Sequence, residues 1–179
     1  YLHKFVQQAR ELLEPEFKER GIDFVVEDHT DGTAFFDEPK ILRVVANIAR
    51  NARQAMGDHG RFSWILRTAE DGYTEFEMTD DGPGVPEAIR DKLFEAFTTA
   101  GKDDGTGLGL AIVRRIVEDH GGTVSFATET GKGTTFTLRM PQSLTLMKAL
   151  LVRIDEDVYG IPAADVEAVG RLEPREIQE

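Results

Sequence analysis

Residues 105–113 read GTGLGLAIV. Three glycines at alternate positions lead directly into an apolar pattern that predicts a helix from about Leu108 to Asp119. Backbone N–H groups and the helix dipole at such a start attract phosphate. The stretch is not a Walker loop, because no Lys-Ser or Lys-Thr pair follows it. It is not a dinucleotide-binding turn either, because no strand pattern precedes it. The stretch therefore predicts a phosphate cradle of another type, with a flexible linker as the alternative.

The rest of the chain alternates between helical and strand periodicity. Apolar residues at helical spacing predict helices over residues 2–20, with a kink or interruption at Pro15, and over residues 39–56. Another helix is expected after Pro86, since proline favours the first helical turn. Period-two alternation predicts strands around residues 22–26, 62–66, 76–78, 124–126 and 136–140. This order predicts a two-layer α/β sandwich, in which helices cover one face of a mixed sheet.

Composition restricts the class of protein. The formal net charge of −12 argues against nucleic acid as a partner, because its phosphates need clusters of Lys and Arg. Cysteine is absent, which excludes disulfides and suits the cytosol. No apolar run approaches the roughly 20 residues of a membrane span, so no direct membrane contact is expected. We interpret the sequence, which starts at Tyr1, as a fragment whose parent could still be membrane-anchored.

One polar pair stands on the helix predicted over residues 39–56. Asn47 and Asn51 are four residues apart, so they share a face of this helix. Asparagine oxygen is a hard, neutral ligand suited to Mg²⁺. Arg50 and Gln54 flank the pair and could add donors. A solvated helix face is the alternative interpretation.

Two further segments place turn residues beside strands. The segment DDGPG at residues 80–84 follows a strand pattern, so a buried carboxylate there could accept a hydrogen bond from the adenine amine. Its glycines would let the backbone approach the ring. The segment GKGTTF at residues 131–136 places two glycines before a strand. A plain turn is the alternative for each segment.

In this order, the segments resemble the boxes of the histidine kinase catalytic domain, whose superfamily also contains gyrase, MutL and a heat-shock chaperone. Residues 47–56 resemble its asparagine box, residues 80–84 its first glycine box and residues 93–99 its phenylalanine box. In the last of these, Phe94 and Phe97 suit core or hinge packing better than stacking on a nucleotide. Residues 105–113 and 131–136 resemble its second and third glycine boxes. The resemblance covers about residues 2 to 141 and implies an ATP-binding sandwich of the Bergerat type.

The resemblance also implies a role for each matching position. Asn51 would ligate Mg²⁺ and Asn47 would line the phosphate pocket, so these two are the candidate catalytic residues. Asp80 would bind the adenine amine, and Lys102, in a lid over residues 98–106, would be a mobile phosphate contact. The other candidate contacts to ATP are Arg50, Gln54, Gly82, Gly84, Gly105, Thr106, Gly107, Leu108, Gly109 and Thr134.

Superfamily members that hydrolyse ATP place a glutamate one helical turn before the metal asparagine, where it activates water as a general base. Here that position is Asn47, which cannot take a proton at neutral pH. The departure favours transfer of the γ-phosphate to a histidine on a separate dimerisation or phosphotransfer domain. None of His3, His29, His59 and His120 lies in the family's H-E-x-R-T-P setting, and His120 suits the end of a helix. We therefore expect ATP binding without self-phosphorylation.

The segment from residue 142 to 179 has a different character. Residues 149–154 and 158–161 predict two strands around a turn at residues 155–157, and thus a short C-terminal β extension. The segment resembles the start of the regulatory domain of chemotaxis histidine kinases, which is related to the chemotaxis coupling protein. It is too short to bury a core alone, so it would pack on the body, pair with another chain or stay mobile. An unusual parent protein or an artificial junction would explain the combination.

The sequence thus predicts a catalytic domain at residues 1–141 and an incomplete coupling-protein-like segment at residues 142–179. The expected partners are the histidine-containing domain, a response regulator indirectly, and a coupling protein or a second copy through the C-terminal segment. Two other functions stay open: an ATP-sensing or degenerate binding module, and a protein serine kinase of the anti-sigma type. The intact asparagine and glycine boxes argue against degeneracy.

Overall fold

The computed structural model describes residues 2–32, 34, 36–98, 107–142, 149–154 and 157–162, and for the last two ranges it describes the backbone alone. The chain divides into two compact units, residues 1–144 and residues 145–179, and each is described by itself.

The first unit is built on one five-stranded mixed sheet. In spatial order its strands are β1 (Ile22–His29), β2 (Gly60–Thr68), β3 (Tyr73–Asp80), β5 (Gly133–Pro141) and β4 (Thr123–Glu129). β1 runs parallel to β2, and the other three pairs are antiparallel. The strands predicted around residues 62–66 and 76–78 are confirmed as β2 and β3, which form an antiparallel hairpin with a turn at Gly72.

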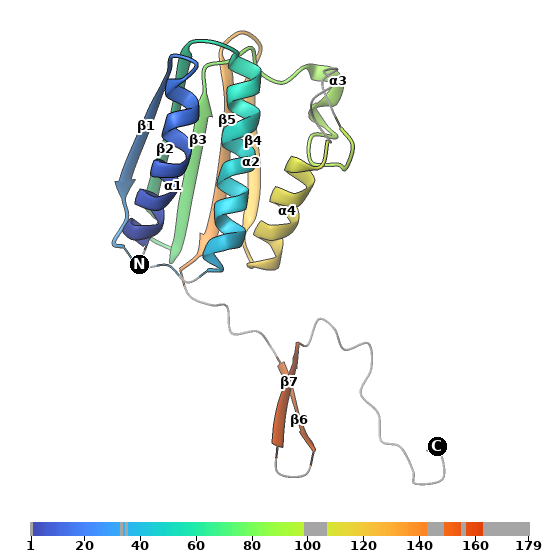
Figure 1. Ribbon diagram of the computed structural model, residues 1–179. Coiled ribbons are helices and arrows are strands. Elements are labelled where there is room, and N and C mark those ends of the chain that lie inside the picture. The colour runs from blue at the N-terminus through green and yellow to red at the C-terminus, as the bar shows by residue number, and fades with distance from the viewer. Residues whose placement is uncertain are drawn as a thin grey trace. The chain divides into compact units, whose positions relative to one another are not determined.

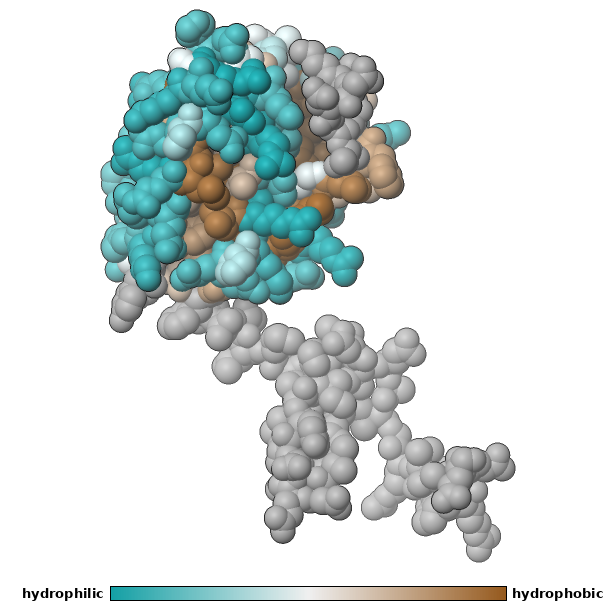
Figure 2. All heavy atoms as spheres, viewed as in Figure 1, coloured by the Kyte–Doolittle hydropathy of each residue, from teal (hydrophilic) through white to brown (hydrophobic). Residues whose placement is uncertain are grey.

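Three helices cover one face of this sheet: α1 (Leu2–Lys18), α2 (Glu38–Met56) and α4 (Gly109–Asp119) (Figure 1). A single-turn helix, α3 (Glu87–Arg90), follows β3. The predicted two-layer α/β sandwich is therefore confirmed. Viewed from the helix side, most of the described surface is hydrophilic, with one group of apolar residues between α1 and α2 and another on the side of α3 and α4 (Figure 2).

Side-chain periodicity explains why these segments fold together. β3 alternates half-buried and buried residues along its whole length, so one of its faces belongs to the core. Trp64 and Phe76 are fully buried beneath the helices, and their ring centroids lie 6.0 Å apart. α2 starts at Asp37, whose side chain accepts a hydrogen bond from the Lys40 amide at 3.1 Å, and ends at Gly57, where φ is +73°.

Two predicted boundaries differ from the structure. Pro15 lies inside α1 and does not interrupt it, because three further residues continue the helix to Lys18. The buried Leu13 and Phe17 on either side of Pro15 hold that last turn against the core, which offsets the backbone hydrogen bond that proline cannot donate. β1 is longer than predicted and reaches His29, since pairing with β2 continues after the apolar alternation ends.

The second unit contains an antiparallel strand pair, β6 (Ala149–Ile154) and β7 (Asp157–Pro162). The two predicted strands are confirmed there, and the turn predicted at residues 155–157 lies largely outside the described residues. Among the described parts of the chain, no helix has the length and apolar character needed to cross a membrane.

Candidate nucleotide-binding site

Asp80 ends β3 as a buried carboxylate with only 5% of its surface exposed. The Gly82 amide donates a hydrogen bond to its Oδ1 at 3.0 Å, and the Thr134 amide donates to the carboxylate as well. Burial raises the pKa of the Asp80 carboxyl above its ordinary value, although these two donors partly oppose the shift. An ionised carboxylate can only accept hydrogen bonds, so this group can recognise an amine.

The backbone around Asp80 is packed too tightly to admit side chains. A Cβ atom on Gly82 would lie 2.8 Å from Asp80 Oδ1, and one on Gly84, where φ is +78°, would lie 2.6 Å from the Glu129 carbonyl oxygen. Thr128 Oγ1 of β4 is bonded to the segment that follows Gly84, because it accepts a hydrogen bond from the Val85 amide at 2.9 Å. Residues 80–84 and 131–136, which the sequence treats as separate turns, are therefore one continuous surface.

α2 links this surface to the glycine-rich start of α4. Near its C-terminal end, Met56 Cγ would lie 3.3 Å from a Cβ atom on Gly82. Nine residues earlier, Asn47 Oδ1 would lie 3.6 Å from a Cβ atom on Gly109. The two contacts are separated by about 13 Å along the helix axis. α2 thus contacts the surface beside the buried carboxylate near its C-terminal end and the N-terminus of α4 further back along its length.

Asn47 has an unused hydrogen-bond donor at this junction. Its Nδ2 atom is buried and has no partner among the described residues. A buried donor without a partner is costly, so a ligand with acceptor oxygens would stabilise it. The α4 N-terminus beside it presents amides that also suit an anion. This end of the site therefore fits phosphate.

The remaining α2 candidates lie along the same helix. Asn51 is half-buried, whereas Arg50 and Gln54 are exposed. No cluster of three or more acidic or histidine side chains that could hold a metal exists among the described residues. An amide oxygen such as that of Asn51 fits Mg²⁺ as a single protein ligand, with phosphate and water supplying the others.

The structure explains why a glycine stands at position 107, which the sequence alone does not reveal. Its φ is +64°, and a Cβ atom there would lie 2.6 Å from Phe97 Cα. The Phe97 amide donates to the Gly107 carbonyl at 2.8 Å, so the two ends of the segment at residues 98–106 lie side by side. Leu108 is the N-cap of α4. Lys102, Gly105 and Thr106 lie outside the described residues.

The two aromatic residues of the phenylalanine segment separate in the structure. Phe94 packs against the rings of Phe126 and Phe136, as expected for a core residue. Phe97 is instead 77% exposed, with a positive φ of 66°, so the predicted packing of this side chain is wrong. Its backbone is fixed by Gly107, and its side chain is left in solvent.

The histidines occupy positions away from Asn47 and Gly109. His120 Nδ1 lies 2.6 Å from the Ile116 carbonyl oxygen and its Nε2 accepts from the Asp37 amide at 3.3 Å, so it closes α4 and ties it to the start of α2. His3 and His29 each contact a carboxylate of β1. The predicted role of His120 at a helix end is confirmed.

Sequence reasoning missed two residues of this region. Thr128, which orders the wall beside Asp80, is an ordinary strand threonine in the sequence. Arg43 lies one helical turn before Asn47 and lines a groove between α2 and α4. Its spacing of four from Asn47 is the one signal in the sequence that could have indicated it.

Structural comparison defines the class. The catalytic domain of the histidine kinase ThkA, solved in a nucleotide-free form, matches 79% of this chain and 92% of its own length, with a TM-score of 0.70 and 29% sequence identity. The sandwich is thus that of a histidine kinase catalytic domain.

The sequence profile described as "Histidine kinase-, DNA gyrase B-, and HSP90-like ATPase" matches residues 36–144. The chain belongs to this family, and it carries the ATP-binding catalytic domain of the protein-histidine kinase class. The resemblance drawn from the sequence is confirmed for this part, whereas the coupling-protein-like segment stays a prediction.

Two curated relatives extend the comparison. The gliding motility regulatory protein of Myxococcus xanthus is 34% identical over 210 residues, which cover 95% of this chain and 27% of that protein. The sensor histidine kinase ZraS of Escherichia coli strain K12 is 42% identical over 109 residues, which cover 61% of this chain and 23% of that protein. The chain therefore spans about a quarter of the length of these relatives.

Proposed function

We propose that this domain binds Mg-ATP between Asp80 and the start of α4 and donates the γ-phosphate to a histidine on a separate dimerisation or phosphotransfer domain. The observation that carries the proposal is the buried Asp80 carboxylate, held by two backbone amides beside glycines that leave no room for side chains. Such a group selects an amine-bearing base. ATP as the donor places the domain in the cytoplasm.

At the other end of the site, the protein's task is positioning. Asn47 would donate its unpaired Nδ2 to phosphate, and Asn51 would present an amide oxygen to Mg²⁺. Mg²⁺, when bound, neutralises phosphate charge and holds the oxygens in place. Because Asn47 cannot accept a proton from water, the residues favour transfer to an incoming nucleophile over hydrolysis.

The acceptor is proposed to lie outside this chain. The imidazoles of His3, His29 and His120 each have a polar partner remote from the phosphate end, and His59 lies against Gly21. A histidine that attacks phosphorus is itself the nucleophile, so the domain need not supply a base. A response regulator would then take the phosphoryl group from that histidine.

The test combines binding and transfer. Calorimetry with Mg²⁺ and a non-hydrolysable ATP analogue should show one site, and labelled ATP should leave this chain unlabelled. Adding the histidine-containing domain of the parent protein should give an acid-labile phosphoryl group on that domain. Absence of nucleotide binding would refute the site. Acid-stable label on a partner's serine would favour the anti-sigma type of kinase instead.

We further propose that residues 1–141 are the catalytic domain and that residues 142–179 begin a coupling-protein-like regulatory domain. The strand pair β6–β7 supports this, since two strands alone bury too little to be stable. The Myxococcus match covers 95% of this chain, which leaves about 9 of the 179 residues outside it. Wherever those residues lie, the match includes most of residues 145–179. That argues against an artificial junction.

Deletion of residues 142–179 tests this division. Nucleotide affinity should stay within about twofold, whereas association with the parent organism's coupling protein, or with a second copy of the chain, should be lost. Retained association after the deletion would contradict the role given to the segment.

A further inference from the structure

Two arginines of the described structure differ from all the others. Every other arginine whose side chain is described has a carboxylate or another hydrogen-bond partner. Arg43 and Arg50 have neither among the described residues, and both are exposed. This is unexpected in a chain with 33 acidic and 21 basic residues, where a free carboxylate is rarely far away.

Both unpaired guanidinium groups belong to α2, and they lie on either side of Asn47. Arg43 is four residues before Asn47 and Arg50 is three residues after it, so all three share one face of the helix. Arg43 is therefore about 6 Å along the axis from the side chain whose Nδ2 has no partner. The sequence already indicates Arg50 as a donor for ATP, but it gives Arg43 no role.

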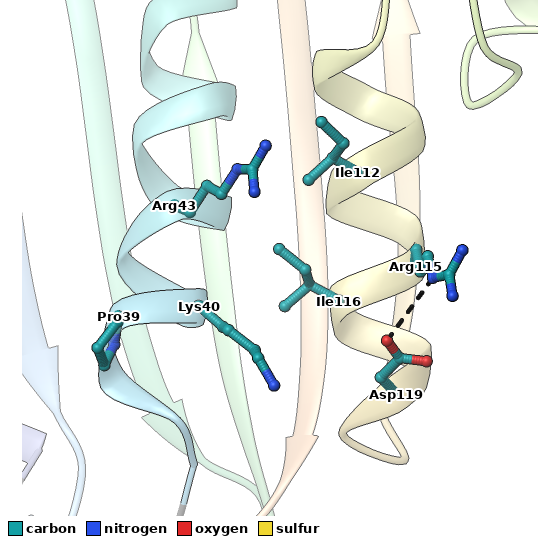
Figure 3. Close-up of a pocket in the computed structure, with 7 residues that line it drawn as sticks. All are labelled: Pro39, Lys40, Arg43, Ile112, Arg115, Ile116 and Asp119. Atoms are coloured by element: carbon teal, nitrogen blue, oxygen red, sulfur yellow. Dashed lines mark ion pairs between the residues drawn. The ribbon is translucent and has the colours of Figure 1, made fainter.

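The side chain of Arg43 also extends in the relevant direction. It reaches from α2 across the gap towards Ile112 of α4, level with that residue (Figure 3). Ile112 is one turn after Gly109, at which α4 begins. The gap is a groove of about 440 Å³ whose α4 side is lined by Ile112, Arg115, Ile116 and Asp119. The guanidinium faces Ile112, the lining residue of α4 that is nearest in sequence to Gly109.

From these positions we propose that Arg43 contacts and orients the γ-phosphate of bound ATP, a role that rests on the proposed function. ATP enters with its base at Asp80, so the terminal phosphate is the part nearest to Arg43. During transfer, the bond from the γ-phosphorus to the β–γ bridging oxygen breaks and the bond to the acceptor nitrogen forms, with ADP leaving. The charge on the three γ-oxygens persists throughout, and a planar guanidinium can hold two of them.

The neighbouring cations do not compete for this role. Lys40 lies one turn further from Asn47 and is paired with Asp37 at 3.2 Å. Arg115, across the groove, is turned towards Asp119 (Figure 3). Lys40 therefore provides a matched control. Its replacement by alanine removes one positive charge from the same groove, but the Lys40 side chain is not expected to contact the phosphate.

The experiment is calorimetric titration of the chain with Mg-AMP-PNP and with Mg-ADP, which differ in the γ-phosphate. Arg43→Ala should weaken AMP-PNP binding about five- to tenfold and leave ADP within about twofold. Arg43→Lys should recover part of the lost AMP-PNP affinity, because lysine keeps the positive charge but cannot bind two phosphate oxygens in the bidentate way of a guanidinium. Lys40→Ala should leave both affinities unchanged. Since Arg43 is exposed, these variants should keep the parent's thermal transition.

Three outcomes would overturn the proposal: no change for AMP-PNP in Arg43→Ala, equal weakening of AMP-PNP and ADP, or an equal effect of Lys40→Ala. Equal weakening would show a general electrostatic effect and no contact with the terminal phosphate. If the unsubstituted chain bound neither nucleotide, the proposed function would fail first, and the two failures would be distinguishable.

Discussion

Replacing Asp80 with asparagine separates recognition of adenine from folding. The substitution keeps the size of the side chain and one acceptor oxygen, which can still accept from the Gly82 amide. The other oxygen becomes an NH₂ group. An NH₂ group cannot accept a hydrogen bond from the amine of the base.

The expected loss follows from the bond that disappears. A hydrogen bond to a charged, buried group contributes about 1.5–3 kcal/mol. At about 1.4 kcal/mol for each factor of ten, Asp80→Asn should weaken ATP-analogue binding roughly 10- to 100-fold. Guanine nucleotides carry a carbonyl where adenine carries its amine, so the preference for adenine should also narrow.

The stability of the folded protein should not fall together with the nucleotide affinity. Because burial raises the Asp80 pKa above 3.8, the folded protein holds this proton more tightly than the unfolded chain. Stability therefore falls as pH rises from 3.8 through the folded-state pKa, and at neutral pH the ionised carboxylate carries the full cost. Asp80→Asn removes that cost, so its thermal midpoint at pH 7 should equal or exceed that of the parent.

The assay is calorimetry with Mg-AMP-PNP at pH 7, repeated at successively lower pH, beside thermal unfolding. The parent's affinity should fall as Asp80 takes up a proton, with a steeper pH dependence than that of Asp80→Asn. Asp81→Asn is the matched control, because Asp81 is exposed and accepts from the Arg61 amide. An Asp80→Asn affinity within twofold of the parent, or an equal loss in Asp81→Asn, would refute the assignment of the adenine contact.

Three more substitutions test other parts of the structure. Asn51→Ala should make nucleotide binding much less dependent on Mg²⁺. If the affinities measured with Mg²⁺ and with EDTA differ as much in the variant as in the parent, Asn51 is not the Mg²⁺ ligand. Gly107→Ala should force the backbone away from Phe97, since φ is +64° and the new Cβ would lie 2.6 Å from Phe97 Cα; amide exchange near Phe97 should rise, and unchanged exchange would contradict the contact. His120→Ala should cost about 1 kcal/mol in urea unfolding by removing the link between α4 and α2, and an unchanged midpoint would show that the link is dispensable.

Much of the fold was predictable because its signals are local. The apolar periodicity of residues 39–56 and the alternation around residues 76–78 depend only on neighbours in the chain, so they gave the correct element types for α2 and β3. Pro15 was misjudged because tertiary burial of Leu13 and Phe17 outweighs a local rule about proline. Phe97 was misjudged for a related reason: its backbone is hydrogen-bonded to Gly107, ten residues away in the sequence, and a local pattern does not reveal that contact.

The candidate site shows the same division. Residue type and order alone indicated an acceptor-only carboxylate, a pair of amides and a glycine-rich helix start, since the chemistry of a side chain is contained in its identity. Folding decided that Asp80 meets Thr134 across neighbouring strands, that Asn47 faces Gly109, and that Arg43 is left without a carboxylate. Proximity between distant segments and the partner of each charge depend on how helices pack on the sheet, and no local pattern in the chain encodes that packing.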